Sequence, residues 1–454
     1  MRYYIDPFGC VKNQVDAENM MAHLNTAGWE CSPEAENADL IIVNSCGFIE
    51  SAKQESIDAV LEWRKIYPNK KILLAGCLTQ RYEKELKESL PEADELFGVR
   101  NIAGITQTAS KLITTPHSPL PTPSLIQGER PILSLPGSAY VKISEGCNNN
   151  CSYCAIPLIR GGLKCRSIPD IVEECKTLLA RGIKELCIIG QDIGSFGEKN
   201  NTKLSSPSSP LPTPHYLLPS LLKAISKLKG HFWVRLLYIH PDHFPLGILD
   251  IMEKDHRFLP YFDIPFQHAS SKILSAMNRR GNAGQYLKLI KTIRARLPLA
   301  VIRSTFLLGF PGETEEDFVE LLDFQQKAQL DWLGCFAYSC EEGTPAFSMK
   351  GQVSKSTAAA RKQTIEERQV PITEHRMERY SGQERVVLIE EQIEGGRDSQ
   401  SFYLGRLYCH APEIDGAAVI AGGETADNPP QLGTLVPCRV IARRGFDLEV
   451  QLHK

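Results

Sequence analysis

Apolar runs and amphipathic stretches alternate through the first 113 residues of the chain. Three runs are typical of strands, in RYYIDPFGC, ADLIIVNSC and KILLAGC, and a stretch of helical periodicity follows each of them. The first of these helices, VDAENMMAHLNTAG, is expected to end at Gly28. Strands that alternate with helices indicate a parallel sheet covered on both faces. Residues 1–113 are therefore predicted to form a doubly wound α/β domain.

The same alternation resumes at Ala139 and continues through the middle of the chain. Six strand patterns are present, in AYVKIS, ELCIIG, WVRLLYI, FDIPF, AVIRSTFLLG and WLGCFAYS, with helical stretches between them. Six strand–helix units are too few to close an eight-stranded barrel. Residues 133–374 are therefore predicted to form an open, partial (β/α)6 barrel.

The last part of the chain changes to short β-runs, in RVVLIEE, SFYLGRLY, TLVPCRVI and DLEVQL. These runs predict a small antiparallel β-barrel of OB-like type over residues 376–454. Residues 114–132 and 199–215 are rich in Pro, Ser and Thr. The first segment is predicted to be a linker and the second a loop insertion. The hexapeptide SPLPTP occurs in both segments. Exposed extended loops are the favoured interpretation, and a proline-rich ligand for a partner is the alternative.

Composition restricts the class of protein. No apolar run approaches 18 residues, and MRYYIDPFGC lacks the apolar core of a signal peptide, so we expect a cytoplasmic protein without membrane contact. A net charge of −3 argues against a protein that coats nucleic acid. Fourteen cysteines in a reducing compartment need an explanation other than disulfides.

One group of cysteines is local. Cys147, Cys151 and Cys154 lie in SEGCNNNCSYC with C-x3-C-x2-C spacing, just after the first strand of the predicted partial barrel. Thiolate ligands favour zinc or an iron–sulfur cluster, and a structural zinc site normally has a fourth Cys or His, which is absent nearby. Three unliganded thiols on an exposed loop would be prone to oxidation. The spacing therefore predicts a four-iron cluster with one iron open to another ligand.

A second group of cysteines is dispersed along the chain. Cys10, Cys46 and Cys77 each end a predicted strand, in FGC, VNSC and AGC. Each of them alone could be a buried core residue. Because the carboxyl ends of parallel strands share one edge of a sheet, all three are expected to converge there. This pattern predicts a second cluster with three protein ligands.

The C-x3-C-x2-C motif beside a partial barrel resembles the radical S-adenosylmethionine superfamily. The resemblance implies that the open iron binds the amino and carboxylate groups of S-adenosyl-L-methionine, and that an electron from the cluster cleaves its sulfonium. It also implies that Tyr153 lies near the adenine and that Gly190 and Gln191 contact the amino group. The sequence GQD at 190–192 departs from the usual Gly-Gly-Glu of that family.

Two cysteine triads, in FGCVKNQVDAEN, VNSCGFIESA and AGCLTQRY before a radical domain, resemble the methylthiotransferases. This resemblance spans nearly the whole chain and implies two [4Fe-4S] clusters and a C-terminal TRAM domain. The N-terminal cluster would hold the sulfur that is transferred. An electron donor and a sulfur source are also implied, and the sequence identifies neither.

The family modifies either an adenosine of tRNA or a ribosomal protein. The segments YFDIPFQHAS, GCFAYSCEEGTPAF and APEIDG resemble the ribosomal-protein branch, which acts on the β-carbon of an aspartate in protein number twelve of the small subunit. Residues 380–454 hold seven Lys and Arg against eleven Asp and Glu, a net charge of −4. An acidic barrel suits a basic protein better than tight nucleic acid binding. Glu413 and Asp415 are therefore predicted to recruit the substrate, although the acids could simply form a solvated surface.

Other features are open to different interpretations. A non-catalytic iron–sulfur module that binds RNA and senses oxidation is the competing class of function. His240 and His243 are interpreted as loop residues rather than ligands. The segment GFPGE, 309–313, lacks the Lys-Ser/Thr of a phosphate-binding loop, so we expect a turn after a strand of the partial barrel.

Overall fold

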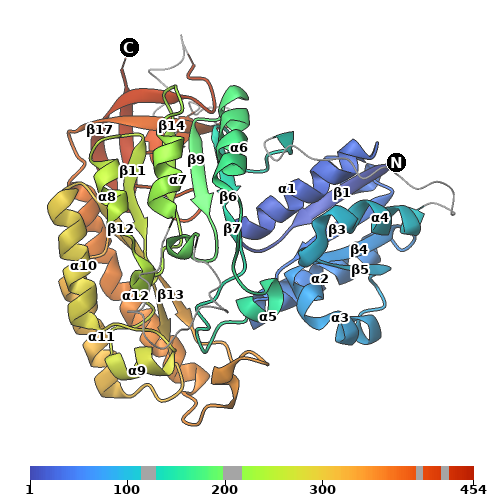
Figure 1. Cartoon of the computed structure of the whole chain (residues 1–454), viewed down its shortest axis with the longest axis horizontal. Helices are drawn as coiled ribbons and strands as arrows, with labels where there is room; N and C mark the ends of the chain where they lie inside the picture. Colours follow the sequence, from blue (N-terminus) through green and yellow to red (C-terminus); the bar gives the residue numbers. More distant parts are fainter. Residues whose placement is uncertain (114–128, 198–216, 395–401, 421–428, 454) are drawn as a thin grey trace, which may run out of the picture. The chain divides into compact units, whose positions relative to one another are not determined.

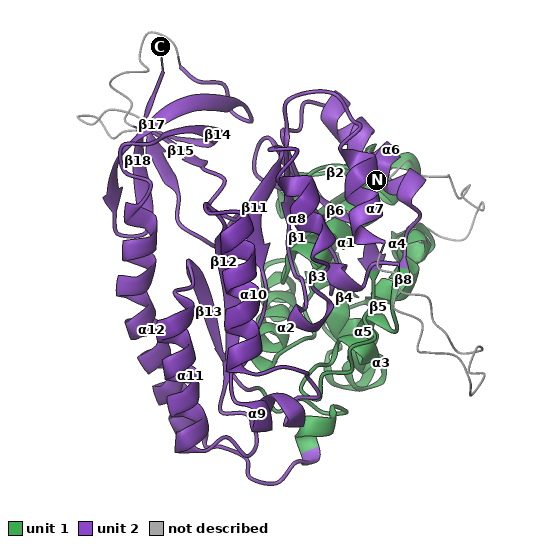
Figure 2. Cartoon of the chain, turned by 60° about the vertical axis from the view of Figure 1, so that its left-hand side comes forward, with its two compact units in different colours: residues 1–133, 145–164, 339–347 green, residues 134–144, 165–338, 348–454 purple. Residues whose placement is uncertain are grey.

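The computed structural model describes residues 1–113, 129–197, 217–394, 402–420 and 429–453. The predicted insertion at 199–215, most of the predicted linker and both copies of SPLPTP lie outside these residues. The chain forms two compact units (Figure 2). Unit 1 comprises residues 1–133, 145–164 and 339–347, and unit 2 comprises residues 134–144, 165–338 and 348–454.

Unit 1 is built on a five-stranded parallel sheet (Figure 1). In spatial order its strands are β2 (Glu30–Cys31), β1 (Arg2–Pro7), β3 (Leu40–Ser45), β4 (Lys71–Gly76) and β5 (Glu95–Gly98). Its helices are α1 (Val11–Thr26), α2 (Glu50–Ile66), α3 (Cys77–Ser89) and α4 (Ile105–Ile113). The predicted doubly wound domain is confirmed, although the short strands β2 and β5 were not predicted.

Both faces of this sheet are covered, which explains why its central strand reads as a continuous apolar run. On β3, Leu40 and Ile42 pack against residues of α1 and α4 on one face. Ile41 and Val43, which point to the other face, pack against residues of α2 and α3. This alternation gives two hydrophobic cores, one on each side of the sheet.

Two further segments of the chain belong to unit 1. Residues 145–164 contain the short helix α5 (Ile156–Arg160), which follows the C-x3-C-x2-C motif. The short strands β7 (Ser144–Glu145) and β8 (Lys164–Cys165) lie at the two ends of this segment. Both cysteine triads are therefore in the same unit.

Unit 2 contains a six-stranded parallel sheet in sequential order, which confirms the predicted partial barrel. Its strands are β6 (Ser138–Lys142), β9 (Glu185–Ile189), β10 (Trp233–Leu236), β11 (Phe258–Asp263), β12 (Val301–Leu308) and β13 (Trp332–Ala337). Its helices are α6 (Ile168–Ala180), α7 (Leu218–Ile225), α8 (Gly247–Met252), α9 (Ser271–Ala276), α10 (Ala283–Arg296), α11 (Glu315–Ala328) and α12 (Lys355–Glu378).

The fourth strand of the partial barrel lies earlier than predicted. The run FDIPF placed it at 262–266, whereas β11 covers Phe258–Asp263. Pro265 has no N–H to donate to a ladder, which favours an end to the strand before it. Pro260 lies within β11, in a stretch where the register against β10 shifts. The strand tolerates this proline because the regular pairing is interrupted there.

The C-terminal residues form a closed five-stranded barrel, as predicted. Its strands are β14 (Glu384–Ile393), β15 (Phe402–Arg406), β16 (Ala418–Ile420), β17 (Leu435–Arg444) and β18 (Asp447–Leu452). The barrel is not wholly antiparallel, since β16 runs parallel to β18. The strand β16 has three residues, too few for a recognisable sequence pattern. Within the described ranges, no helix combines the length and apolarity that crossing a bilayer requires.

Candidate functional site

Three cysteines lie at the carboxyl edge of the sheet in unit 1. Cys10 is the N-cap of α1, three residues after β1 ends. Cys46 follows the last residue of β3, and Cys77 is the first residue of α3, directly after β4. Because β1, β3 and β4 are parallel neighbours, the structure brings the three predicted ligands to one edge.

Two glycines allow the cysteine-bearing segments to approach closely. Gly9 has a φ of +90°, and a Cβ atom there would lie 3.0 Å from the Cβ and 3.3 Å from the Sγ of Cys46. A Cβ atom on Gly47 would lie 2.7 Å from the backbone carbonyl of Cys77. The segments that carry Cys10, Cys46 and Cys77 are therefore in direct van der Waals contact.

The three thiols are close enough to influence each other's ionisation. Burial raises the pKa of Cys77 to about 12; Arg160 opposes this rise, while Cys10 and Cys46 add to it. Burial also raises the pKa of Cys46. Cys10 is exposed as a residue, but its sulfur is enclosed by protein atoms. This burial alone would raise the pKa of Cys10. The positive charges of Lys12 and Arg160 together have the larger effect, so the pKa of Cys10 is lowered. Positive charge beside the triad therefore opposes the effect of burial, which disfavours the thiolate form that binds metal at Cys46 and Cys77.

Arg160 and Asn13 contact Cys77, and neither was predicted from the sequence. Arg160 Nη2 lies 3.2 Å from Cys77 Sγ. Asn13 Oδ1 lies 3.7 Å from the same sulfur, and its Nδ2 donates to the carbonyl oxygens of Phe8 and Ser45 at 2.6 and 3.1 Å. Both side chains resemble ordinary helical polar residues in the sequence, and their only signal is proximity along the chain to a cysteine motif.

The second triad lies on a single loop between β7 and α5. Cys147 N donates to Gly161 O at 3.1 Å, and Cys154 N donates to Cys151 O at 3.0 Å. The loop begins at Gly146, where φ is +70° and a Cβ atom would lie 2.5 Å from Gly161 O. The start of the loop is thus joined to the residue that follows α5, which confines the three predicted ligands to one compact segment. Cys151 is buried, and the other two are half-buried.

The residues predicted to contact S-adenosylmethionine belong to different units. Tyr153 lies on the cysteine loop of unit 1 and is half-buried. Gly190 and Gln191 follow the last residue of β9, at the carboxyl edge of the sheet in unit 2. A Cβ atom on Gly190 would lie 2.7 Å from Ser144 Oγ, so a larger residue does not fit there. The contacts of all three with the cofactor stay predictions.

The next residue, Asp192, is engaged within the fold. Its Oδ1 accepts hydrogen bonds from the backbone N–H groups of Gly194 at 2.9 Å and His240 at 3.1 Å. Its Oδ2 accepts from Ser195 Oγ at 2.6 Å and lies 2.8 Å from His243 Nδ1. Ser195 Oγ also lies 2.8 Å from His243 Nδ1. In a hydrolytic Ser-His-Asp triad the serine and the aspartate contact different nitrogens of the histidine, so these three residues do not have the geometry of such a triad. These hydrogen bonds connect the loop after β9 with the loop after β10.

The segment GFPGE forms the expected turn after β12. Glu313 Oε2 accepts hydrogen bonds from Gly309 N at 2.6 Å and Phe310 N at 3.2 Å, which closes the turn on itself. Arg361 of α12 pairs with the other carboxylate oxygen at 2.8 Å. The glutamate thus fixes the turn from within.

The two acids predicted to recruit substrate have different environments. Asp415 is a buried carboxylate whose side chain is 2% exposed. Its Oδ2 accepts from Tyr261 Oη at 2.6 Å and from Ala411 N at 2.8 Å, and Arg303 Nε lies 3.7 Å from its Oδ1. Burial raises its pKa to about 6. Asp415 is thus occupied within unit 2, whereas Glu413 is exposed and has a φ of +62°.

The segment that carries these acids is tied to the partial barrel at further points. Trp332 Nε1, at the start of β13, donates to Cys409 O at 2.8 Å. Arg235 Nη1, on β10, donates to Tyr408 O at 2.9 Å. Together with the contacts of Asp415 to β11 and β12, these bonds hold the connection between β15 and β16 against four strands of the partial barrel.

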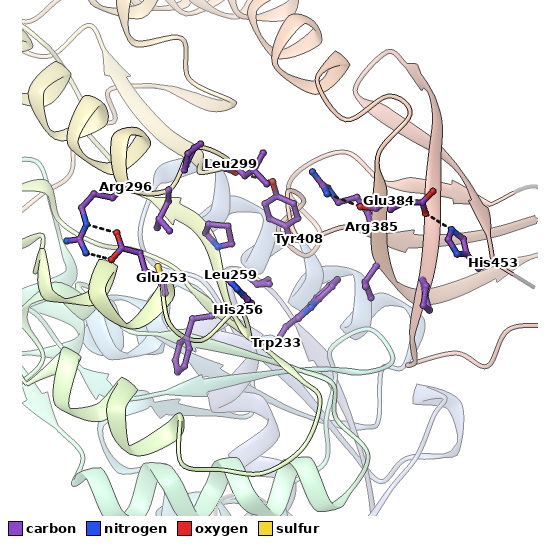
Figure 3. Close-up of a pocket in the computed structure, with 17 residues that line it drawn as sticks. Trp233, Glu253, His256, Leu259, Arg296, Leu299, Glu384, Arg385, Tyr408 and His453 are labelled. Atoms are coloured by element: carbon purple, nitrogen blue, oxygen red, sulfur yellow. Dashed lines mark hydrogen bonds and ion pairs between the residues drawn. The ribbon is translucent and has the colours of Figure 1, made fainter.

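A pocket of about 750 Å³ lies at the amino ends of β10 and β11 (Figure 3). It is lined by Trp233 and Phe258, the first residues of β10 and β11, and by Tyr408 and Arg385 from the C-terminal part of unit 2. None of the predicted site residues lines it. The chemistry-bearing residues follow the carboxyl ends of strands, so size alone does not make this pocket the active site.

Within the part of the chain that the structure describes, no three His, Cys, Asp or Glu side chains form a ready site for one metal ion. In a four-iron cluster each thiolate binds a different iron, so the sulfurs need not share a single ion. The donor set suits such a cluster, since thiolates hold iron–sulfur clusters. Each triad supplies three of them at one location.

Three family models match consecutive parts of the chain. They are "Uncharacterized protein family UPF0004" over residues 2–98, "Radical SAM superfamily" over 141–324 and "TRAM domain" over 382–452. These matches confirm the predicted radical domain and the predicted TRAM domain. The three models correspond to the three folded regions described above.

Similar curated proteins cover nearly the whole chain. A ribosomal protein uS12 methylthiotransferase RimO of Treponema denticola is 46% identical over 98% of this chain and 99% of its own length. The protein of the same name from Syntrophomonas wolfei is 40% identical, with 97% of both chains covered.

A solved structure shares the fold of this chain. It is the radical S-adenosylmethionine methyltransferase TsrM from Kitasatospora setae with cobalamin and a [4Fe-4S] cluster bound. The TM-score is 0.51 at 13% identity, over 76% of this chain and 73% of that one. At this identity the likeness supports the fold alone.

Proposed function

Since the chain belongs to the family of ribosomal protein uS12 methylthiotransferases, we propose that it attaches a methylthio group to the β-carbon of an aspartate in ribosomal protein uS12. The observation that carries this proposal is the pair of three-cysteine sites in unit 1. One site would hold the cluster that cleaves S-adenosyl-L-methionine, and the other would hold the cluster at which sulfur is kept for transfer. A ribosomal protein as substrate implies action in the cytoplasm.

Two [4Fe-4S] clusters are proposed, one for each triad. Cys10, Cys46 and Cys77 would hold the N-terminal cluster, and the second would be held by the loop residues Cys147, Cys151 and Cys154. When bound, these groups supply the electron that cleaves S-adenosyl-L-methionine and the site at which sulfur is held for transfer. The chain's own contribution is to keep three thiolates together and to leave one iron of each cluster without a protein ligand.

Three residues are proposed to bind S-adenosyl-L-methionine. Gly190, at the end of β9, packs so closely on Ser144 that a Cβ atom there would lie 2.7 Å from Ser144 Oγ. Gln191 follows it at the carboxyl edge of the sheet, where the amino group of the cofactor would be bound. Tyr153, between the second and third cysteines of the loop, would lie near the adenine.

The substrate is proposed to meet the exposed carboxylate of Glu413. Glu413 lies in the connection between β15 and β16. Buried Asp415 anchors this connection by accepting hydrogen bonds from Tyr261 and Ala411. The net charge of −4 over residues 380–454 complements a protein rich in lysine and arginine and favours fast encounter with it. The same charge disfavours tight binding of RNA, because neutralised phosphates supply most of that affinity.

The activity is tested with the protein purified without air, S-adenosyl-L-methionine, a reductant, a sulfide source and recombinant uS12. We expect 5′-deoxyadenosine and one methylthiolated aspartyl peptide, detected by mass spectrometry. A variant without the thiols at 147, 151 and 154 is expected to give neither product. A variant without the thiols at 10, 46 and 77 is expected to form 5′-deoxyadenosine without modifying uS12.

Two outcomes would contradict the proposal. If the reduced protein modifies an adenosine of tRNA and leaves uS12 unchanged, the chain acts on RNA. If no 5′-deoxyadenosine forms under reducing conditions, the non-catalytic sensor of oxidation is the better account, and we would then expect RNA affinity that falls steeply with salt.

A further inference from the structure

Arg160 is a buried cation beside the proposed N-terminal cluster site. It is the last residue of α5, six residues after Cys154, and its side chain is 1% exposed. One terminal nitrogen, Nη2, lies 3.2 Å from Cys77 Sγ and 2.8 Å from Asp16 Oδ2. The other, Nη1, donates to Glu145 Oε1 at 2.7 Å. All of these residues belong to unit 1.

The partners of Arg160 come from both cysteine-bearing regions. Cys77 is a proposed ligand of the N-terminal cluster, and Asp16 lies on α1, six residues after Cys10. Glu145 lies two residues before Cys147 on the other cysteine loop. The planar guanidinium of Arg160 therefore links the sulfur of Cys77 in one triad to Glu145, which precedes the loop that carries the other triad.

A hydrogen bond to a ligand sulfur has a known effect on a cluster. It withdraws negative charge from the sulfur and stabilises the more negative, reduced state, and such bonds are among the features that set the reduction potential. Burial strengthens this effect, because little solvent screens the guanidinium. The carboxylate of Asp16, whose side chain is 0% exposed, pairs with the guanidinium at 2.8 Å and balances its buried positive charge.

We propose that Arg160 is a positioning residue that donates an N–H···S bond to Cys77 and raises the reduction potential of the N-terminal cluster. This inference rests on the proposed function, since it needs a cluster at that triad. The reaction concerned is the uptake of one electron, from [4Fe-4S]²⁺ to [4Fe-4S]⁺, and dithionite supplies the electron in the test.

The test uses a full-length background in which Cys147, Cys151 and Cys154 are replaced by alanine, so that only the N-terminal cluster remains. Arg160→Lys keeps the charge near Asp16 but cannot reproduce the planar fork. We expect the one-electron reduction constant to fall at least tenfold, a shift of about 59 mV to lower potential, in a titration followed by electron paramagnetic resonance. The control is Arg100→Lys, since the guanidinium of Arg100 donates to backbone oxygens of α5, those of Leu158 and Ile159.

A second variant and a measurement on the unsubstituted arginine cover the case in which Arg160→Lys loses its cluster. The pair Asp16→Asn with Arg160→Gln removes both buried charges together and should show the same lowered potential. In protein labelled with ¹⁵N-arginine, pulsed resonance of the reduced N-terminal cluster should reveal a coupling to a nitrogen-15 nucleus. This coupling needs no substitution at Arg160.

The outcomes separate this inference from the proposed function. If the background protein binds no iron, the N-terminal cluster of the proposed function is wrong. If it binds a four-iron cluster whose potential is the same in the arginine and lysine forms, the role of Arg160 is wrong. Absence of the nitrogen-15 coupling in a protein with a full cluster would overturn the N–H···S bond directly.

Discussion

Cys77 and Cys438 are both buried thiols, and burial raises the pKa of each to about 12. Their neighbours differ. Cys77 lies at the sheet edge with Cys10, Cys46 and the cation of Arg160 close by. Cys438 lies on β17 in the C-terminal barrel and is 0% exposed. Burial alone therefore does not distinguish a proposed ligand from a core residue, and the convergence of several thiols does.

This difference leads to a prediction about iron content. Cys77→Ala should lower the iron of the anaerobically reconstituted protein from about eight to about four per chain, because one four-iron cluster loses a ligand. Cys438→Ala should leave the iron unchanged, since it removes only a small buried group. Colorimetric iron and Mössbauer spectroscopy measure the result. Equal iron in the two variants would contradict the assignment of Cys77.

The ionisation of Asp415 leads to a second prediction. Its pKa in the folded protein is about 6, above the usual value for an aspartate, so the folded state binds a proton more strongly than the unfolded state. The stability that this carboxyl contributes is full below about pH 4 and is lost as the pH rises to about 6. Between pH 5 and pH 7, the free energy of unfolding of the wild-type protein should fall by on the order of 1 kcal/mol relative to that of Asp415→Asn.

Thermal unfolding of the two proteins at both pH values checks this expectation. The difference between their midpoints should change by a few degrees in favour of the variant at pH 7. A difference that stays constant with pH would mean that Asp415 ionises normally in the folded protein.

At the scale of elements, Gly9 shows how a turn brings two cysteines together. Its φ of +90° is matched by that of Gly28, +86°, after α1. The space around them differs. A Cβ atom on Gly9 would press on Cys46, whereas no atom of the described residues lies within 4 Å of a Cβ atom on Gly28. Both positions carry the same backbone strain for other residues, and only Gly9 adds a steric conflict with a proposed ligand.

Gly9→Ala should therefore deplete the N-terminal cluster, and Gly28→Ala should retain it. The variants are best compared by iron per chain in the background that lacks Cys147, Cys151 and Cys154. Loss of iron in both would attribute the effect to backbone strain. Retention in both would mean that the contact between Gly9 and Cys46 is unimportant.

The connection between β15 and β16 gives a prediction about substrate. Glu413→Gln removes an exposed charge from the anchored segment. We expect KM for uS12 to rise about fivefold, which corresponds to roughly 1 kcal/mol of binding, with kcat unchanged. The increase should be largest at low salt, where surface charges are least screened.

The matched control is Glu391→Gln, the same charge change at an exposed residue of β14. It should leave KM unchanged if the location of the charge matters. Equal effects of the two variants would instead assign recruitment to the overall acidity of the C-terminal barrel.

At the scale of the whole molecule, the sequence predicted the three folded regions because each has its own period of apolar positions. The doubly wound domain, the six units of the partial barrel and the small closed barrel were all found. The strands that were missed are short: β2, β5, β7, β8 and β16 have between two and four residues. Runs of that length carry too few apolar positions to establish a period.

The candidate site was predictable to the extent that its chemistry lies in one residue type. Cysteines at strand ends or at close spacing can be found in a sequence. The partners of Cys77 cannot, because Asn13 and Arg160 lie 64 and 83 positions away from it along the chain. The burial of Asp415 could not be predicted either. In the sequence it resembles an exposed loop residue, whereas in the structure Tyr261 and Arg303 enclose it.

This chain is proposed to use two three-thiol sites to modify an aspartate of uS12. This proposal is tested most directly in a strain from which the coding sequence has been deleted, complemented with the wild type or with the variant that lacks the thiols at 10, 46 and 77. Tandem mass spectrometry of uS12 should find the methylthio group on one aspartyl peptide only with the wild type. A methylthiolated peptide in the deletion strain, or with the variant that lacks the N-terminal triad, would contradict the account.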